Sequence, residues 1–135
     1  MATQIFVNLP VKDLDKTVAF YTKLGFSFNP QFTDENATCM IVSDESFVMF
    51  LVESYYKTFT TKDICDAKRS SEVIVCISAD SREGVDEMIN KAVEAGAVIP
   101  KDKQDLGFMY SHSFEDPDGH LWEVMNMDMT SFSGT

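Results

Sequence analysis

The sequence predicts an α+β fold of two tandem βαβββ modules that together form a mixed sheet. The first observation is an order of elements that occurs twice: an apolar run, a capped helix and three further strand-like runs. The second is that each helix ends at a glycine, Gly25 in one copy and Gly96 in the other. We place the modules at residues 3–53 and 72–128, with a linker at residues 54–71, in one domain of residues 1–135.

The first module has a clear local pattern. Residues 5–9 are a short apolar run typical of a buried strand, and Asp13 is suited to cap the helix that follows. Leu14, Val18 and Tyr21 recur at helical spacing and predict its buried side. Three strands are then expected at residues 26–32, 38–42 and 47–52, separated by polar turn segments.

The second module repeats this order. A strand is expected at residues 72–78, and Asp80 with Glu83 has the spacing of a capping box. The helix after them carries an apolar side of Val85, Met88, Ile89, Ala92 and Val93. Strands at residues 97–99, 108–114 and 121–127 complete the module.

The last two strands are joined by a turn with the sequence Asp-Pro-Asp-Gly at residues 116–119. Proline presets its own φ, aspartate bonds nearby backbone N–H groups and glycine accepts a positive φ, so a tight antiparallel connection is expected. Strand alternation then places Glu123 on the same face as apolar neighbours. A carboxylate in such a place is paired, protonated, metal-bound or at the wall of a cavity.

Composition excludes several classes of function. The chain has 135 residues and a net charge of −11, which opposes binding to nucleic acid and to anionic membrane surfaces. No apolar run approaches the length of a membrane span. The three cysteines form no CxxC pair, and Cys76 within an apolar strand is expected to be a buried, inert thiol. We therefore expect a cytoplasmic protein.

Four short segments, two near each end of the chain, carry a family resemblance. The N-terminal segments are FVNLPVKDL at residues 6–14 and FYTKLGF at residues 20–26, and the C-terminal ones are DPDG at residues 116–119 and WE at residues 122–123. Together with the repeat, they resemble the opening and closing signatures of the vicinal oxygen chelate superfamily. That superfamily includes glyoxalase I, extradiol dioxygenases, fosfomycin resistance enzymes and bleomycin-binding proteins. The resemblance implies that the modules form a cup-shaped mixed sheet.

The resemblance also locates the family's metal ligands. Its metal-dependent members place His and Glu ligands on the first and last strands of each module, which here correspond to Phe6, Phe50, Ile74 and Glu123. Only Glu123 retains a ligand chemistry, and a lone carboxylate does not hold a transition metal. Bleomycin-binding members are a precedent for a cup that binds a ligand without a metal. No cofactor is therefore expected, and a divalent metal is the less favoured alternative.

We predict five residues in the binding site: Phe6, Asn8, Phe50, His112 and Glu123. Glu123 has two interpretations, a carboxylate that bonds a ligand or one satisfied by a neighbour such as Asn8 or His112. His112 forms an acid–base pair with Glu123 if the register brings the two together, and is otherwise an ordinary hydrogen-bonded or exposed histidine. The aromatic residues either line a cavity or fill it.

The leading hypothesis is a metal-free protein that binds a small organic ligand, probed by a Glu123→Gln substitution. The rival is a lyase or dioxygenase whose divalent metal is held by His112, Glu123 and water. A third hypothesis is a filled cup that only mediates assembly. A homodimer is expected in each case, because the superfamily's cups are often completed by a second chain and the methionine-rich last strand suits an interface.

Overall fold

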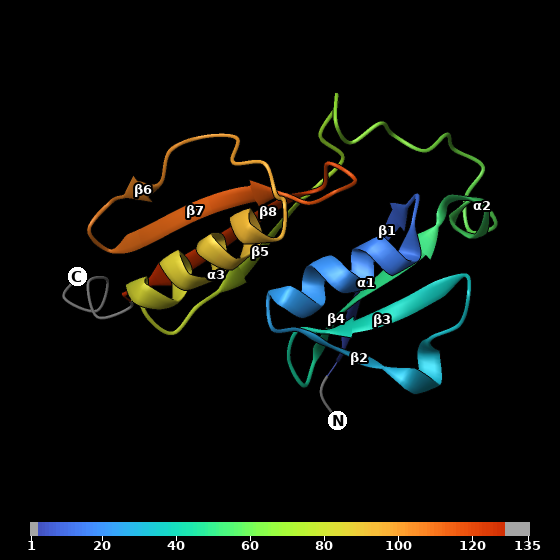
Figure 1. Ribbon diagram of the computed structural model, residues 1–135, viewed down its shortest axis with the longest axis horizontal. Helices are drawn as coiled ribbons and strands as arrows, with labels where there is room; N and C mark the ends of the chain where they lie inside the picture. Colours follow the sequence, from blue (N-terminus) through green and yellow to red (C-terminus); the bar gives the residue numbers. More distant parts are fainter. Residues whose placement is uncertain (1–2, 129–135) are drawn as a thin grey trace. The chain divides into compact units, whose positions relative to one another are not determined.

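The computed structural model describes residues 3–128, so the ends of the predicted domain lie outside the described residues. The chain divides into two compact units, Met1–Cys65 and Asp66–Thr135, and the division falls within the predicted linker. Each unit contains one four-stranded sheet with a helix packed against it (Figure 1). The α+β class and the duplicated module are therefore confirmed.

The first unit follows the predicted order of elements. These are β1 (Ile5–Val11), α1 (Leu14–Lys23), β2 (Ser27–Asn29), the short 3₁₀ helix η1 (Pro30–Phe32), β3 (Ala37–Ile41), β4 (Ser46–Val52) and α2 (Glu53–Tyr56). The sheet order is β1-β4-β3-β2, with β1 parallel to β4 and the other pairs antiparallel. A parallel pair at one edge follows from the helix that separates β1 from the three later strands.

Helix α1 begins and ends where the sequence predicts. The Asp13 side chain accepts a hydrogen bond from the Lys16 N–H at 3.2 Å, and Gly25 adopts a positive φ of 101° just after the helix. Thr17, Phe20 and Tyr21 are its buried residues. The buried side is thus slightly rotated from the predicted one, which packs the aromatic side chains against the sheet.

The second unit has the same topology. Its elements are β5 (Ile74–Ser78), α3 (Arg82–Glu94), β6 (Gln104–Asp105), β7 (Met109–Glu115) and β8 (Leu121–Met127). The sheet order is β5-β8-β7-β6, again with one parallel pair, β5 and β8. Val85, Ile89 and Ala92 of α3 are buried, and the helix contacts β7 and β8 (Figure 1).

Two local predictions in this unit were wrong. The cap of α3 is Ser81, whose hydroxyl accepts from the Gly84 N–H at 3.0 Å, because Ser81 has the extended backbone that a capping residue needs. The segment at residues 97–99 is not a strand. Only Val98 pairs there, through both backbone bonds to Glu115, and the short strand β6 that follows was not predicted.

The turn at residues 116–119 has the predicted geometry. The Asp116 carboxylate accepts from the N–H groups of Asp118 at 3.0 Å and His120 at 2.9 Å. Gly119 has φ 92°, and its N–H donates to the Asp116 carbonyl at 2.9 Å. The turn sets the pairing of β7 with β8, in which Glu115 stands opposite Leu121. This register decides which side chains share a face.

Candidate functional site

The sheet of the second unit has one face covered by α3 and one open face. Tyr110 is on the helix side, because its hydroxyl donates to Asp86 of α3 at 2.6 Å. Alternation along β7 and the register with β8 therefore place Ser113 and Glu123 on the open face, directly opposite each other. Cys76 of β5 stands opposite Glu123 on its other side. These three residues form one row across the open face.

Ser113 and Glu123 are close neighbours within this row. The backbone of Glu115 bonds outward to Val98, so the backbone groups of Ser113, two residues earlier, also point away from β8. Ser113 and Glu123 are consequently a non-hydrogen-bonded pair, the kind in which side chains approach most closely, with Cβ atoms about 4.5–5.5 Å apart. The row therefore brings a hydroxyl and a carboxylate together.

Neither of these two side chains makes a hydrogen bond to another of the described residues. The Ser113 side chain is buried, with 5% of the residue exposed, and its Oγ has no hydrogen-bond partner among the described residues. Glu123 is half-buried, and within residues 3–128 no hydrogen bond reaches its carboxylate. Buried polar groups in native proteins are nearly always bonded. A buried, unpartnered hydroxyl beside a half-exposed carboxylate is the clearest sign of a binding site in this unit.

The third member of the row is an exposed thiol, whereas the sequence predicted a buried one. Partial burial and the neighbouring Glu123 carboxylate both raise the pKa of Cys76 above its ordinary value. A raised pKa keeps the thiol protonated near neutral pH, which opposes a role as nucleophile. Cys76 can instead act as a weak hydrogen-bond donor.

The first unit also has an open face, and it carries two of the predicted site residues. Phe6 is 46% exposed and stacks on Phe47, its partner on β4, with ring centroids 4.8 Å apart. Asn8 is exposed on the same face, where its side-chain N–H donates to the Phe6 carbonyl at 3.3 Å. This face therefore offers an aromatic surface with one amide beside it.

Phe50 does not belong to this open face, so its prediction as a lining residue was wrong. It pairs with Leu9, is fully buried and stacks on Tyr21 of α1 with centroids 4.8 Å apart. The residue of β4 that shares a face with Phe6 and Asn8 is Met49, one position earlier. Phe50 is part of the core between α1 and the sheet.

The predicted pairing of His112 with Glu123 was also wrong. His112 stands opposite Val124, and the two side chains lie on the helix side of the sheet. Glu123 is on the other side, so the backbone of the sheet separates the imidazole from the carboxylate. They share neither a proton nor a metal in this arrangement, and Glu123 is not satisfied by His112.

His112 instead lines a groove of about 570 Å³ on the helix side of the second unit. The other lining residues come from α3 and from the segment before β6: Asp86, Ile89, Asn90, Ile99, Asp102 and Lys103. His112 is half-buried, and among residues 3–128 no hydrogen bond reaches its ring. The groove is distinct from the open face around Glu123.

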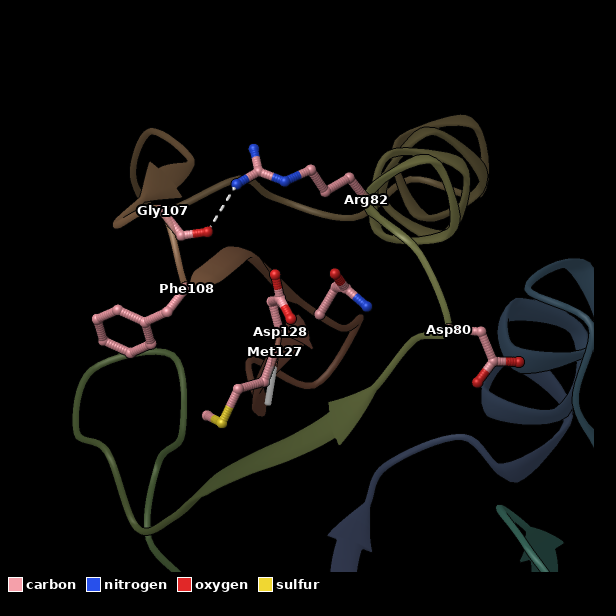
Figure 2. A pocket seen from close by; sticks show the side chains of 7 residues that line it. Asp80, Arg82, Gly107, Phe108, Met127 and Asp128 are labelled. Carbon is pink, nitrogen blue, oxygen red and sulfur yellow. Dashed lines mark hydrogen bonds between the residues drawn. The ribbon is translucent and has the colours of Figure 1, made fainter. Parts of the chain in front are cut away.

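A second groove of about 470 Å³ lies at the end of the same sheet. Figure 2 shows Arg82 extended toward Gly107, with Phe108 and Asp80 on opposite sides of the groove. Arg82 donates to both carboxylate oxygens of Asp105, at 2.7 and 2.9 Å, and to the Gly107 carbonyl at 3.1 Å. These bonds occupy the guanidinium and give it a structural role at this end of the sheet.

Known proteins with the same fold are similar to this chain. Residues 3–43 match a family model described as bleomycin resistance protein-like N-terminal. A glyoxalase/bleomycin resistance protein/dioxygenase family enzyme from Burkholderia phytofirmans PsJN superposes with a TM-score of 0.79 at 19% identity, over 93% of this chain and 99% of that one. The chain therefore has the fold of these proteins, and its residues 3–43 are similar in sequence to that N-terminal family.

Two other solved structures show the same likeness in fold over most of the chain. A hypothetical protein from S. aureus has 26% identity and a TM-score of 0.78, over 93% of this chain and 95% of that one. A lactoylglutathione lyase from Agrobacterium tumefaciens has 16% identity and a TM-score of 0.69, over 93% and 94%. No curated protein matches the chain. Among residues 3–128, no helix has the length and apolarity of a membrane span.

The donors on the open faces do not fit the metal centre that the superfamily's metal-dependent members use. In the second unit, Glu123 stands beside Cys76, whose thiol stays protonated because its pKa is raised. In the first unit, the matching strands present the stacked rings of Phe6 and Phe47. Within residues 3–128 no group of three or more His, Cys, Asp or Glu side chains is placed to hold a metal ion. Transition metals need several such donors in a fixed geometry.

Sequence reasoning did not identify Ser113, although a signal was present. Ser111 and Ser113 alternate with the large residues of β7, so small polar side chains share one face of that strand. Combined with the residue count of the Asp-Pro-Asp-Gly turn, this alternation places Ser113 opposite Glu123. The missing step was the register of β7 with β8, which also determines the place of His112.

Proposed function

We propose that this chain is a small-molecule binding protein of the glyoxalase/bleomycin-resistance type, whose ligand contacts the open face of the second unit at Ser113 and Glu123. The observation that carries the proposal is the 5% exposed Ser113 hydroxyl, which has no hydrogen-bond partner among the described residues and lies beside the half-exposed Glu123 carboxylate. Leaving a buried polar group unbonded costs about 1–3 kcal/mol. A ligand that bonds both groups recovers that cost.

The chemistry of the pair indicates the kind of group that binds there. A carboxylate accepts hydrogen bonds only, and the Ser113 hydroxyl can accept one as well. The ligand group is therefore an N–H or O–H donor. The net charge of −11 favours a cation over an anion, so an amine or amidine is the preferred donor.

The open face of the first unit, taken by itself, suits an apolar and planar ligand. The open face of the first unit carries the stacked rings of Phe6 and Phe47 with Asn8 beside them. Exposed aromatic rings provide a surface on which a planar body can stack. We propose that Phe6 and Asn8 bind a ligand on this face of the first unit, which keeps the role that the sequence predicted for them.

We propose that binding needs no metal, because the donors do not fit one. Elemental analysis of untagged protein purified without chelators, beside the Glu123→Ala variant, tests this. We expect no stoichiometric metal in either sample. Iron, manganese, nickel or zinc that is lost in the variant would contradict the proposal and restore a metal-dependent lyase or dioxygenase reaction.

The assembly and location remain proposals that the surface supports. Tyr55 and Phe59 are exposed, with their rings in edge-to-face contact 5.1 Å apart, and such aromatic patches are typical of interfaces. We propose a homodimer that uses this patch, and light scattering should give a mass of two chains. Cys39 and Cys76 are not in disulfides, which fits the reducing cytoplasm that we propose as its location.

The decisive experiment is a thermal-shift screen with a library of aromatic amines and the corresponding aromatic carboxylates. We expect the amines to stabilise the protein and the carboxylates to have no effect. Affinity for the best amine should fall about tenfold or more in Glu123→Gln, since hydrogen bonds to charged groups contribute about 1.5–3 kcal/mol. Glu94→Gln, at the exposed end of α3, is the matched control.

Two results would reject the proposal. One is an amine whose affinity is the same in Glu123→Gln and in the wild type. The other is loss of folding in Glu123→Gln, measured by circular dichroism, which would make Glu123 a structural residue. In the first case the ligand site would have to be sought elsewhere in the molecule.

A further inference from the structure

The groove that contains His112 has polar groups that neither the fold nor the proposed function uses. Its floor is the imidazole of β7, and one wall is α3, where Asp86, Ile89 and Asn90 lie three and four residues apart and so share a helix face. The other wall is formed by Ile99 and Lys103 of the segment between Val98 and β6.

The groove exists because the chain leaves the sheet edge at this place. Val98 pairs with Glu115, and pairing resumes only where Gln104 meets Ser111. Residues 99–103 therefore stand opposite residues 112–114 alone, which is too short a stretch for them to follow as a strand. They arch away from β7, and the resulting space of about 570 Å³ is of the size that small-molecule sites have.

The charged groups at one end of the groove already interact with one another. The Tyr110 hydroxyl donates to Asp86 at 2.6 Å, and the Lys103 ammonium lies 5.7 Å from the centroid of the same ring. The Tyr110 hydroxyl and the Asp86 carboxylate together raise the pKa of Lys103. This cluster is neutral as a whole and is satisfied without a ligand.

The polar groups that remain are planar, the Asn90 amide and the His112 imidazole. Asn90 is exposed, and within residues 3–128 no hydrogen bond reaches its amide or the His112 ring. An amide offers donors and an acceptor, and a neutral imidazole offers one of each. Ile89 and Ile99 supply apolar walls, and the Asp102 carboxylate at the rim repels anions.

We propose that this groove is a second ligand site, which binds an uncharged planar amide or a nitrogen heterocycle of the lactam type. The amide of such a ligand pairs with Asn90 and His112, and its ring lies between Ile89 and Ile99. The site is on the opposite side of the sheet from Glu123. The experiment on this groove therefore tests the second site independently of the proposed function.

The test is a nuclear magnetic resonance titration of the ¹⁵N-labelled full chain with nicotinamide, with nicotinate as the charged analogue of the same ring. We expect saturable shifts at the Asn90 side-chain amide and the His112 ring up to about 10 mM, the weakest dissociation constant expected of so small a fragment. Nicotinate should bind at least about fivefold more weakly, because it replaces the amide donor with a negative charge.

Two variants assign the site. Asn90→Ala changes an exposed residue and His112→Phe keeps a planar ring, and each should weaken nicotinamide binding about tenfold. Lys91→Ala, next to Asn90 and paired with Glu87 outside the groove, should leave it unchanged. Circular dichroism checks that each variant is folded. The proposal is overturned by the absence of saturable shifts at His112 and Asn90, by equal binding of nicotinate, or by unaltered binding in Asn90→Ala.

Discussion

Glu72 and His120 tie the segment that enters the second unit to the turn between its last two strands. The His120 side chain is 2% exposed, and its Nδ1 lies 2.5 Å from Oε1 of Glu72, whose side chain is 24% exposed. The N–H of His120 also donates to Asp116 within the turn. One histidine thus connects residues far apart in sequence, just before the strand that carries Glu123.

Removing the carboxylate of this pair should destabilise the protein. Glu72→Ala leaves the buried imidazole without its charged partner, and we expect the free energy of unfolding to fall by about 1–3 kcal/mol. Urea denaturation followed by tryptophan fluorescence measures the change. Glu35→Ala, at an exposed loop position, should change stability by less than about 0.5 kcal/mol. Equal stability of the two variants would show that the pair is not structural.

The turn glycine is held in place by the same entering segment. A Cβ atom on Gly119 would lie 2.7 Å from the backbone nitrogen of Lys68 and 2.9 Å from the carbonyl carbon of Ala67, at a φ of 92°. Gly107 has a similar φ of 82°, but a Cβ there would meet nothing within 4 Å. The two glycines thus share a left-handed backbone and differ in what a Cβ would meet.

Gly119→Ala should therefore cost more stability than Gly107→Ala. Both lose about 1–2 kcal/mol from the left-handed backbone, and Gly119→Ala should lose at least about 1 kcal/mol more because backbone atoms must shift. Thermal unfolding by calorimetry compares the two. If both variants unfold at the same temperature, the entering segment does not pack on the turn as described.

The ion pair of Arg82 and Asp105 predicts a measurable titration. The guanidinium and the Gly107 N–H lower the pKa of Asp105 to about 2, from an ordinary value of 3.8. A lowered pKa means that the folded state holds the carboxylate more strongly than the unfolded state does. Its contribution to stability is complete above pH 3.8 and is lost as the pH falls toward 2.

Substitution of Arg82 by glutamine should return the pKa of Asp105 toward 3.8. Carboxyl ¹³C shifts across pH 1.5–6 follow this titration directly, a range of about two units on either side of the expected values. Lys91→Gln should leave it unchanged, because Lys91 pairs with Glu87. A normal Asp105 titration in the wild type would show that the exposed pair is not formed in solution.

Much of the fold was predictable because its signals are local. The Asp13 cap, the glycine after α1 and the Asp-Pro-Asp-Gly turn each depend on a few adjacent residues, and the structure confirms all three. The strand β6 was missed because it has only two exposed residues, Gln104–Asp105, without apolar alternation. Its pairing depends on β7, which follows it in the chain.

The site was less predictable because it depends on registers between strands. Alternation correctly grouped residues within each strand, but it does not relate the faces of two strands. His112 was assigned to the side of Glu123 without the register, and Phe50 to the side of Phe6. β1 and β4 are separated by a helix and two other strands, so no short motif determines which of Met49 and Phe50 faces outward.

The neighbourhood of Cys76 and Glu123 can be tested by chemical labelling. Glu123→Gln removes a negative charge that raises the pKa of Cys76, so the thiolate fraction at pH 8 should rise. We expect alkylation of Cys76 by iodoacetamide to become about two- to tenfold faster. Mass spectrometry of the peptides gives the rates, with the exposed Cys65 as an internal control. An unaltered rate at Cys76 would show that the charge of Glu123 does not act on the Cys76 thiol.

The unsatisfied hydroxyl of Ser113 predicts a conflict between stability and binding. Ser113→Ala removes a buried polar group that has no partner among the described residues, so the protein without ligand should become more stable by about 0.5–1 kcal/mol. The same variant should bind the amine found in the Glu123 screen more weakly, by about three- to tenfold.

Ser111→Ala is the matched control for this prediction, because Ser111 is on the same strand face and is 3% exposed. It should show neither the gain in stability nor the loss of affinity. Urea denaturation and calorimetric titration measure the two quantities on the same samples. If Ser113→Ala destabilises the protein instead, the hydroxyl has a partner in the folded state, and the open face loses the observation on which its function was proposed.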